Sequence, residues 1–179
     1  MAGRLDDILD FLPKIRETCV DLQEMLLANL VMIGEKPAPT FGETERVEYL
    51  RQRFSENGLQ NASTDEVDNA LAILPGAELE NPRDILVVAH TDTVFSSKVD
   101  HTYAMTKEYV TGPGVADDSL GLAALATLPA LFEELGIQLT ANLVLMGASR
   151  SLGRGDLEGL RFYLDHADRK PIAGLCVEG

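Results

Sequence analysis

Basic residues, aromatic residues and cysteines are all scarce in this chain. Lysine and arginine number 15 against 29 aspartates and glutamates, which gives a formal net charge of −14, and aromatic residues make up 6%. So acidic a surface repels phosphate groups, and we expect no binding to nucleic acid or to an anionic membrane surface. The two cysteines, Cys19 and Cys176, lie far apart in the sequence. They predict two buried thiols in a reducing cytoplasm rather than a disulfide framework.

The sequence also lacks a leader-like start and a long apolar run. Its N-terminus has no cationic start followed by an apolar stretch, so no signal peptide is predicted. The longest apolar run, 120–132, is shorter than the roughly 20 residues that span a bilayer. We therefore expect a cytoplasmic protein, whose 45% hydrophobic residues are enough for one globular core.

Apolar spacing predicts helices that alternate with strands. Spacings of three and four predict these helices: 4–33 with a break at Pro13, 43–57, 119–135 with a kink at Pro129, and 157–167. Short apolar runs predict these strands: 71–74, 85–89, 141–146 and 172–177, the last three buried, with a polar hairpin within 102–111. The alternation indicates an α/β fold, a three-layer αβα sandwich around a mostly parallel or mixed sheet.

One candidate site follows the apolar run 85–89, where the sequence reads HTDTVF. His90 and Asp92 are two residues apart, so on a strand they point to the same side. They would emerge at its carboxyl end, where open α/β sheets place their sites. A neutral imidazole can bind zinc, and a nearby carboxylate can orient it. The alternative is an ordinary polar cap of the strand.

Two further places could supply carboxylate ligands. Asp117 and Asp118 lie between a glycine-rich turn and a helix. One aspartate there is explained as a helix cap, but two adjacent anions cost energy unless a cation or backbone donors offset them. Glu178 follows the last apolar run and is either a cleft ligand or an exposed end. His101 and His166 lie in polar stretches and are interpreted as surface residues.

Together these segments resemble the co-catalytic zinc peptidase family that includes aminoacylases, glutamate carboxypeptidases, peptidase T and succinyl-diaminopimelate desuccinylase. The matching segments, in order, are GEKPAPTFGETERVEYLRQRF, TDEVDNALAILPG, HTDTVF, GPGVADD and the strand that ends in Glu178. In the second segment, Asp68 stands where the family's Asp-x-x-Gly-Asn hairpin usually has glycine. The resemblance implies an αβα fold and hydrolysis of C–N bonds in small peptides or N-acyl amino acids.

The resemblance also implies roles for individual residues. His90, Asp117 and Glu178 would be metal ligands, with Asp117 bridging two zinc ions, and Asp92 would be the catalytic-site residue that orients His90. The Asp117–Asp118 peptide bond would be cis. In active relatives a Glu–Glu pair follows the next strand. Its first glutamate is the general base and its second binds the other zinc.

That glutamate pair is missing here. The segment GASRSLGRGDLEG (147–159) keeps the glycine frame of the family motif without a gap. It places Ser151 at the base position and Leu152 at the ligand position. Serine near neutral pH cannot take a proton from a zinc-bound water as a carboxylate can, and leucine cannot bind zinc. The sequence therefore predicts one zinc site, a second site that lacks a ligand at Leu152, and a base position that is not functional.

The resemblance covers only part of a family member. Residues 1–179 would form the first part of the catalytic domain, without the lid domain that commonly carries the dimer contact and without the final histidine ligand. The end of the chain directly after a strand also suggests a fragment, and a homodimer is expected only of the full-length protein. We expect a divergent, catalytically impaired family protein with a binding or regulatory role. The alternatives are an active metal-dependent hydrolase of peptide or N-acyl amide bonds and a structural α/β domain without a ligand.

Overall fold

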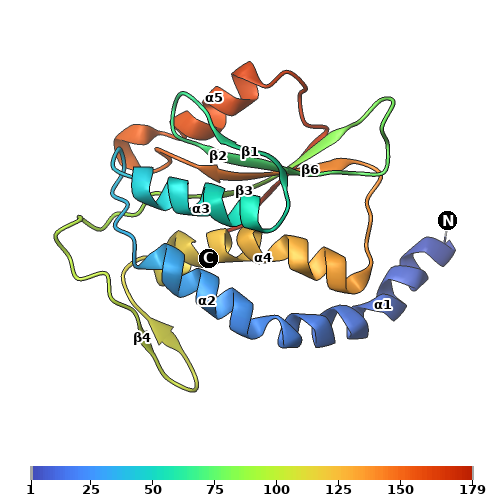
Figure 1. Ribbon diagram of the computed structural model, residues 1–179, viewed down its shortest axis with the longest axis horizontal. Coiled ribbons are helices and arrows are strands. Elements are labelled where there is room, and N and C mark those ends of the chain that lie inside the picture. The colour runs from blue at the N-terminus through green and yellow to red at the C-terminus, as the bar shows by residue number, and fades with distance from the viewer. Residues whose placement is uncertain (1, 179) are drawn as a thin grey trace.

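The computed structural model describes residues 2–178 as an α/β fold with a five-stranded mixed sheet in its middle layer (Figure 1). The sheet has the order β1-β2-β6-β3-β7. Its strands are β1 (Gln60–Thr64), β2 (Ala70–Leu74), β3 (Asp84–His90), β6 (Asn142–Ala148) and β7 (Ala173–Cys176). A separate hairpin is formed by β4 (Ala104–Met105) and β5 (Val110–Thr111). The helices are α1 (Ala2–Asp21), α2 (Gln23–Gly34), α3 (Thr44–Glu56), α4 (Leu120–Leu135) and α5 (Glu158–His166).

The parallel strands β6, β3 and β7 determine where a site can form. β3 pairs in parallel with β6 on one side and with β7 on the other, whereas β2 and β1 are added antiparallel. Every residue of β6 is buried, and β3 is buried except at Ile85, as expected for apolar strands in the centre of a sheet. The carboxyl ends of β6, β3 and β7 therefore meet at one edge, and His90 is the last residue of β3.

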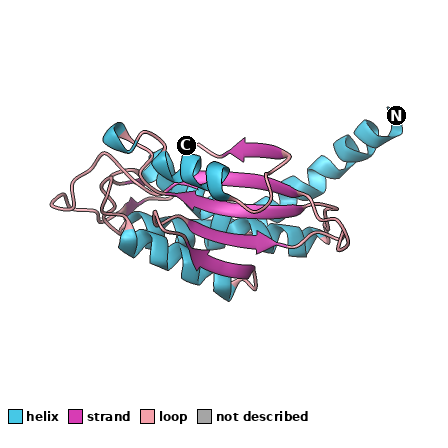
Figure 2. Cartoon of the chain, turned by 90° about the horizontal axis from the view of Figure 1, so that it is seen from above, coloured by secondary structure: helices cyan, strands magenta, loops and turns pink. Residues whose placement is uncertain are grey.

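Helices cover both faces of the sheet, which confirms the predicted αβα sandwich (Figures 1 and 2). On one face α3 and α4 bury the larger core. Its best-buried members include Leu50, Phe54, Leu122, Leu125 and Leu145. On the other face α5 packs Leu160 and Tyr163 against the side chains of β3 and β6. Helix α2 lies along the outer side of α4, and α1 extends from it away from the body of the molecule.

Helix α4 is a core helix with the composition of a membrane-spanning one. The segment 115–135 is long and apolar enough to cross a membrane by length and composition alone. In the structure its side chains pack against the sheet, α2 and α3, and Leu122 and Ala126 are fully buried. Pro129 lies inside this helix, and the kink expected there stays a prediction.

The predicted break at Pro13 is wrong, and one strand was not predicted. The helix predicted to break at Pro13 runs through this residue to Asp21, and the chain turns at Leu22 instead. Pro13 is exposed, so water can hydrate the carbonyl of Leu9, which has no N–H donor from proline. The strand β1 was missed because its sequence, QNAST, has no apolar run and four of its five residues are exposed.

The last predicted strand and the two cysteines are more exposed than expected. All of Ala173–Cys176 is exposed, because β7 is an edge strand and no described helix covers it. Cys176 is exposed for this reason. Cys19 lies in the last turn of α1, where it lines an apolar pocket with Leu22 and Leu26, and it is also exposed. Both thiols are free, so the prediction of no disulfide between them is confirmed and the prediction of burial is corrected.

Candidate metal centre

The candidate centre is built around His90. This residue lies at the carboxyl end of β3 and is 8% exposed. Its Nε2 atom lies 2.9 Å from Asp117 Oδ1 and 3.5 Å from Glu178 Oε1. Its Nδ1 atom lies 3.4 Å from Asp92 Oδ1. The ring is thus enclosed by carboxylates from three separate segments. The structure brings together all four residues that the sequence singled out.

Asp118 is a member of the cluster that the sequence reasoning did not assign as a ligand. Possible ligand atoms of His90, Asp118 and Glu178 all lie within 4.8 Å of one another. Asp118 is fully buried and accepts hydrogen bonds from the backbone N–H groups of His90 at 3.0 Å and Gly121 at 3.1 Å. The Asp117–Asp118 peptide bond is cis, as the resemblance implied. The signal for Asp118 was the adjacent carboxylate pair itself, of which only the first was given a ligand role.

The electrostatics of the cluster favour a positive charge on or beside the imidazole. Burial alone would lower the pKa of His90, but the neighbouring Asp92 carboxylate and the charges of Asp118 and Glu178 raise it to about 9. Burial raises the pKa of Asp118 to about 6, against the lowering effect of the His90 contacts. Carboxylates so close together repel one another. A proton on His90 or a bound metal ion would offset this repulsion.

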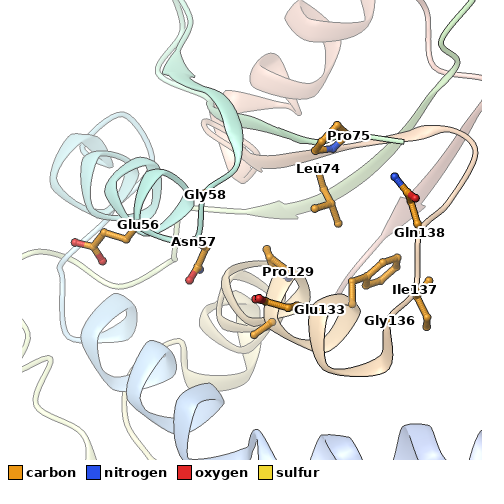
Figure 3. A pocket seen from close by; sticks show the side chains of 12 residues that line it. Glu56, Asn57, Gly58, Leu74, Pro75, Pro129, Glu133, Gly136, Ile137 and Gln138 are labelled. Carbon is orange, nitrogen blue, oxygen red and sulfur yellow. The ribbon is translucent and has the colours of Figure 1, made fainter. Parts of the chain in front are cut away.

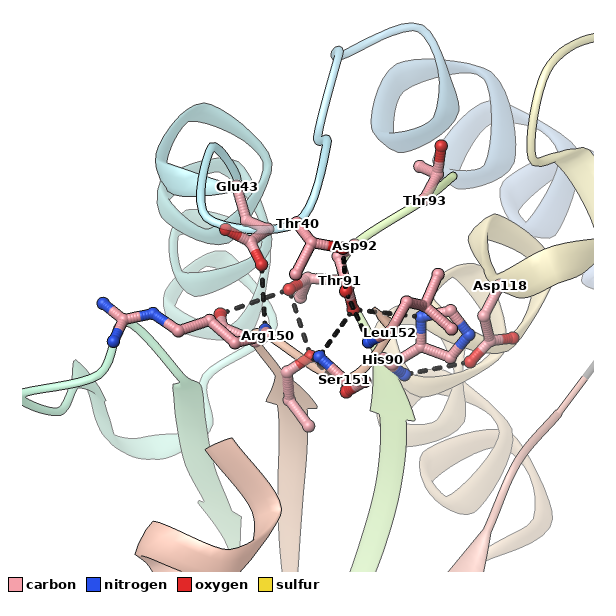
Figure 4. A network of polar contacts seen from close by, with 12 residues as sticks. Thr40, Glu43, His90, Thr91, Asp92, Thr93, Asp118, Arg150, Ser151 and Leu152 are labelled. Carbon is pink, nitrogen blue, oxygen red and sulfur yellow. Dashed lines mark hydrogen bonds and ion pairs between the residues drawn. The ribbon is translucent and has the colours of Figure 1, made fainter. Parts of the chain in front are cut away.

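Asp92 connects His90 to the turn at 150–152. Its Oδ2 accepts hydrogen bonds from Thr40 Oγ1 at 2.7 Å and from the Leu152 N–H at 2.8 Å, and its Oδ1 accepts one from the Ser151 N–H at 3.0 Å (Figure 4). Burial opposes its ionisation, but His90 and these donors lower the pKa of Asp92 to about 2. Asp92 is therefore an ionised anchor, and its contact with His90 Nδ1 directs Nε2 toward the other carboxylates.

A second buried carboxylate fixes the same turn. Glu43 is 3% exposed and accepts a hydrogen bond from the Arg150 N–H at 2.8 Å. Three consecutive amides, those of Arg150, Ser151 and Leu152, are thus bound by Glu43 and Asp92 (Figure 4). Nothing in the sequence around Glu43 indicated this role, because its partner lies 107 residues away.

The glycine frame of 147–159 has a packing explanation. A Cβ atom at Gly159 would collide with Asn69 Oδ1 and the Ser149 carbonyl, so the helix start can approach the β1–β2 turn only without a side chain. Asn69 is fully buried; it donates to Gly159 O at 3.0 Å and accepts from the Ser149 N–H at 2.9 Å. Asp68 beside it has φ +66°, a backbone conformation that favours glycine.

Ser151 and Leu152 line a small cavity together with two members of the cluster, His90 and Glu178. The cavity has a volume of 140 Å³, and its lining residues are Val88, Ala89, His90, Ala148, Ser151, Leu152, Leu157, Leu160, Cys176 and Glu178. The alignment of this loop to the missing Glu–Glu pair stays a prediction. Among these lining residues Glu178 is the one carboxylate, so the cavity wall holds no separate acid that could act as a base.

A larger hollow of 650 Å³ lies at the other end of the sheet, between the last turns of α3 and α4 (Figure 3). Leu74 in its wall pairs with Leu143 near the start of β6, a strand length away from the carboxyl ends that carry the cluster. Its lining includes Glu56 and Glu133 but no histidine or cysteine. Glu56 is already paired with Arg53. This hollow therefore offers no ligand set comparable with that around His90.

The other two histidines differ from each other. His166 is exposed and stacks on Phe162, as expected of a surface residue. His101 is 5% exposed and its Nε2 lies 3.1 Å from Ser96 O, so its prediction as a surface residue is wrong. Its ring nitrogen contacts a carbonyl of the same loop, and apolar periodicity could not indicate such a contact.

The donor set fits a divalent transition-metal ion. One imidazole and two or more carboxylates are ligands that zinc accepts, with bonds of about 2.0–2.2 Å. Two such ligands on a tetrahedral ion lie about 3.4 Å apart. The separations of His90 Nε2 from Asp117 and Glu178, 2.9 and 3.5 Å, bracket that value.

No protein-family model matches the chain, and no curated protein sequence matches it. Several solved structures with a similar fold are described as peptidases. The di-peptidase Dug1p from Saccharomyces cerevisiae has 13% identity over 94% of this chain, with a TM-score of 0.74. The aminopeptidase PepT from Bacillus cereus has 19% identity over 88%, with a TM-score of 0.67. An M20 family metallo-carboxypeptidase from Sulfolobus solfataricus has 16% identity over 86%, with a TM-score of 0.66.

The chain matches only part of each of these proteins. It spans 41% of the yeast protein, 43% of the Bacillus cereus protein and 37% of the Sulfolobus protein. Another similar structure, from Bacillus subtilis, is described as a dinuclear metal-binding peptidase of the M20 family, with 16% identity and a TM-score of 0.59. At such identities the likeness shows the fold: this chain has the α/β architecture found in M20-family peptidases.

Proposed function

We propose that this chain is part of a divergent M20-type protein that binds one zinc ion and does not hydrolyse peptides. His90, Glu178 and the Asp117–Asp118 pair would hold the ion, and Asp92 would orient His90. The observation that carries the proposal is the position of His90 Nε2, 2.9 Å from Asp117 and 3.5 Å from Glu178, although these residues come from distant segments. When bound in such a site, zinc polarises carbonyl groups and activates water.

The missing general base supports an impaired site. Ser151 lies at the expected base position, and its hydroxyl cannot replace a carboxylate in this task. Asp92 cannot substitute, because its two oxygens already accept three hydrogen bonds. Leu152 stands at the position expected for a ligand of a second ion, and a leucine side chain cannot bind zinc. These features support a binding or regulatory role at the remaining metal site.

The wider setting of the chain is also part of this proposal. Residues 1–179 would be the first part of a catalytic domain, and a lid and the rest of that domain would belong to a longer protein that dimerises. The partial coverage of the similar peptidases supports this arrangement. The two free thiols support a reducing, cytoplasmic location. Small peptides or N-acyl amino acids remain the ligand classes that the fold suggests.

The test of impairment is a hydrolysis assay on the zinc-loaded chain with dipeptides and N-acyl amino acids. We expect no turnover above that of the metal-free chain, because loss of a positioned base removes about 10²–10⁴-fold of rate. Zinc-dependent hydrolysis at rates typical of active enzymes would establish the alternative, a working amide hydrolase. The contact between His90 and Asp92 is the observation that favours this alternative, an active hydrolase.

Restoring both glutamates should strengthen metal binding. In Ser151→Glu/Leu152→Glu the turn is already fixed by its backbone amides, so the new carboxylates would project into the cavity beside His90. We expect zinc affinity to rise by about tenfold, which corresponds to about 1.4 kcal/mol. Zinc titration of the variant and the parent chain measures the change.

The matched control is Ser151→Gln/Leu152→Gln, which adds side chains of the same shape without charge and should leave zinc affinity close to that of the parent chain. Unchanged affinity in the glutamate variant would show that the loop is misaligned with the family motif. A fall in affinity would show that the local packing has been remade for another ligand.

A further inference from the structure

We propose that a hollow on the α5 face of the sheet binds a free zwitterionic amino acid. The hollow has a volume of 310 Å³ and lies among β1, β2 and the segment 167–169 that follows α5. Asp84 in its wall is the first residue of β3, whereas His90 is the last, so a strand length separates the hollow from the candidate metal centre. The inference therefore does not rest on the proposed metal site.

Two adjacent residues of opposite charge, Asp168 and Arg169, line this hollow, and both are exposed. The guanidinium of Arg169 is held in place, because its Nε lies 3.0 Å from Asp84 Oδ2 and its Nη2 lies 3.4 Å from Asp84 Oδ1. Asp84 is itself 5% exposed and accepts a hydrogen bond from Asn142 Nδ2 at 2.8 Å. A guanidinium fixed in this way loses little further freedom when it binds a ligand.

Both charged groups keep capacity for a ligand. Within residues 2–178 the Nη1 donors of Arg169 and the carboxylate of Asp168 make no hydrogen bond or ion pair. Asp84 and, to a smaller extent, Asp168 raise the pKa of Arg169, because these opposite charges lie close together.

This arrangement of charges matches one class of ligand. The carboxylate of Asp168 lies outside the pair of Asp84 with Arg169, so it favours an ammonium group, while the free guanidinium N–H groups favour a carboxylate. An α-amino acid carries both of these groups on one carbon atom. It can therefore contact Asp168 and Arg169 at the same time.

The floor of the hollow is aliphatic. Leu71, Ile73 and Val144 from β2 and β6 belong to the apolar cluster on the α5 face, and Leu71 and Ile73 are only partly buried. Tyr163 from α5 also lines the hollow, and burial together with the charge of Asp84 raises its pKa. Its hydroxyl is therefore neutral at pH 7 and can donate or accept a hydrogen bond. An apolar floor with a few polar groups suits a small-molecule site.

An irregularity of β1 adds two neutral polar side chains. Gln60 pairs with Ile73 and Ser63 pairs with Leu71, so β1 has one residue more than β2 between these two pairs. Asn61 lies in this bulge with φ +54°, and both Asn61 and Ser63 line the hollow. Bulges of this kind change the direction of side chains and are frequent beside functional sites.

Volume and net charge narrow the ligand further. The 310 Å³ hollow equals about ten water molecules at about 30 Å³ each, which is room for one amino acid with a branched aliphatic side chain. Its charged lining residues are Asp84, Asp168 and Arg169, so a simple anion would meet more negative than positive charge. Leucine is therefore the first ligand to test.

The test is a titration of the isotope-labelled chain with leucine, followed by the backbone amide chemical shifts in NMR spectra. We expect shifts at 61–63, 71–73 and 167–169, with the same dissociation constant in the presence and absence of zinc. N-Acetylleucine lacks the ammonium group and leucinamide lacks the carboxylate, and each should bind about tenfold more weakly. Glycine lacks the aliphatic side chain and should also bind about tenfold more weakly.

Substitutions assign the two charges separately. Asp168→Asn should remove the preference for leucine over N-acetylleucine, and Arg169→Gln should remove the preference over leucinamide. The matched control is Asp165→Asn, which changes an exposed carboxylate on α5 outside the hollow and should keep both preferences. The Asp168 variant decides the outcome even if loss of the pair with Asp84 destabilises the Arg169 variant.

Three results would overturn the inference. The first is no binding of leucine by the folded chain. The second is a set of shifts confined to the surroundings of His90, since the amino acid would then lie at the candidate metal centre. The third is the same preference for leucine over N-acetylleucine in Asp168→Asn as in the Asp165→Asn control. None of these results bears on zinc binding, so this inference and the proposed function can fail separately.

Discussion

Replacing Arg46 with methionine is expected to lower the free energy of unfolding by about 3–5 kcal/mol. Arg46 is 0% exposed, and its guanidinium donates hydrogen bonds to the backbone carbonyls of Gly34, Lys36 and Thr91. Methionine would leave all of these carbonyls without their donor. Burial lowers the pKa of Arg46, which the neighbouring Tyr103 and two carboxylates partly offset, to about 10. The side chain is therefore still charged at neutral pH.

The matched variant for this prediction is Arg46→Lys, which keeps the charge but loses the planar fork that reaches several carbonyls at once. We expect it to lose less stability than the methionine variant. Urea denaturation followed by circular dichroism measures both losses. A loss below about 1 kcal/mol in the methionine variant would contradict the assigned role of Arg46, since this is the usual size for one ordinary hydrogen bond.

Replacing Asp92 with asparagine is expected to weaken zinc binding by about 10–100-fold. Asp92 is 0% exposed, and its carboxylate faces His90 Nδ1 at 3.4 Å and accepts the amides of the 151–152 turn. Asparagine has one acceptor oxygen, so it would lose the negative charge beside the imidazole and leave some of these donors unpaired. Both effects loosen the orientation of His90.

Asp84→Asn is the control for this effect. Asp84 is the first residue of the same strand, is 5% exposed, and contacts Asn142 and Arg169 rather than the metal cluster. The Asp84→Asn variant should lose stability without losing zinc affinity. Zinc titration at a temperature where both variants remain folded separates local from global effects. Equal loss of affinity in the two variants would show that Asp92 acts only through the fold.

Most of the fold could be predicted from apolar periodicity, because the central strands are buried on both faces. The run 85–89 lies within β3 and the run 141–146 overlaps β6, and the helices expected at 43–57 and 119–135 correspond to α3 and α4. β1 could not be predicted, since a polar edge strand has no such pattern. The exposure of 172–177 was also unpredictable, because composition does not show what covers a strand.

The candidate site could be predicted as a set of residues but not as a bonded network. His90, Asp92, Asp117 and Glu178 follow strand or loop ends, and strand ends meet at one edge of a sheet. The contacts of the turn with Glu43 could not be predicted, because they join segments without a shared periodicity. The ligand role of these residues stays a prediction.

The most direct test of this account is zinc titration of the unaltered chain beside His90→Ala, with the bound metal counted per chain. We expect one zinc ion per parent chain, and a loss of affinity on the order of 100-fold or more in the variant, since an imidazole ligand is a larger contributor than the residue that orients it. No zinc binding by the folded parent chain would contradict the account. Binding that is equally strong in the variant would contradict it as well, because the ion would then lie away from the cluster around residue 90.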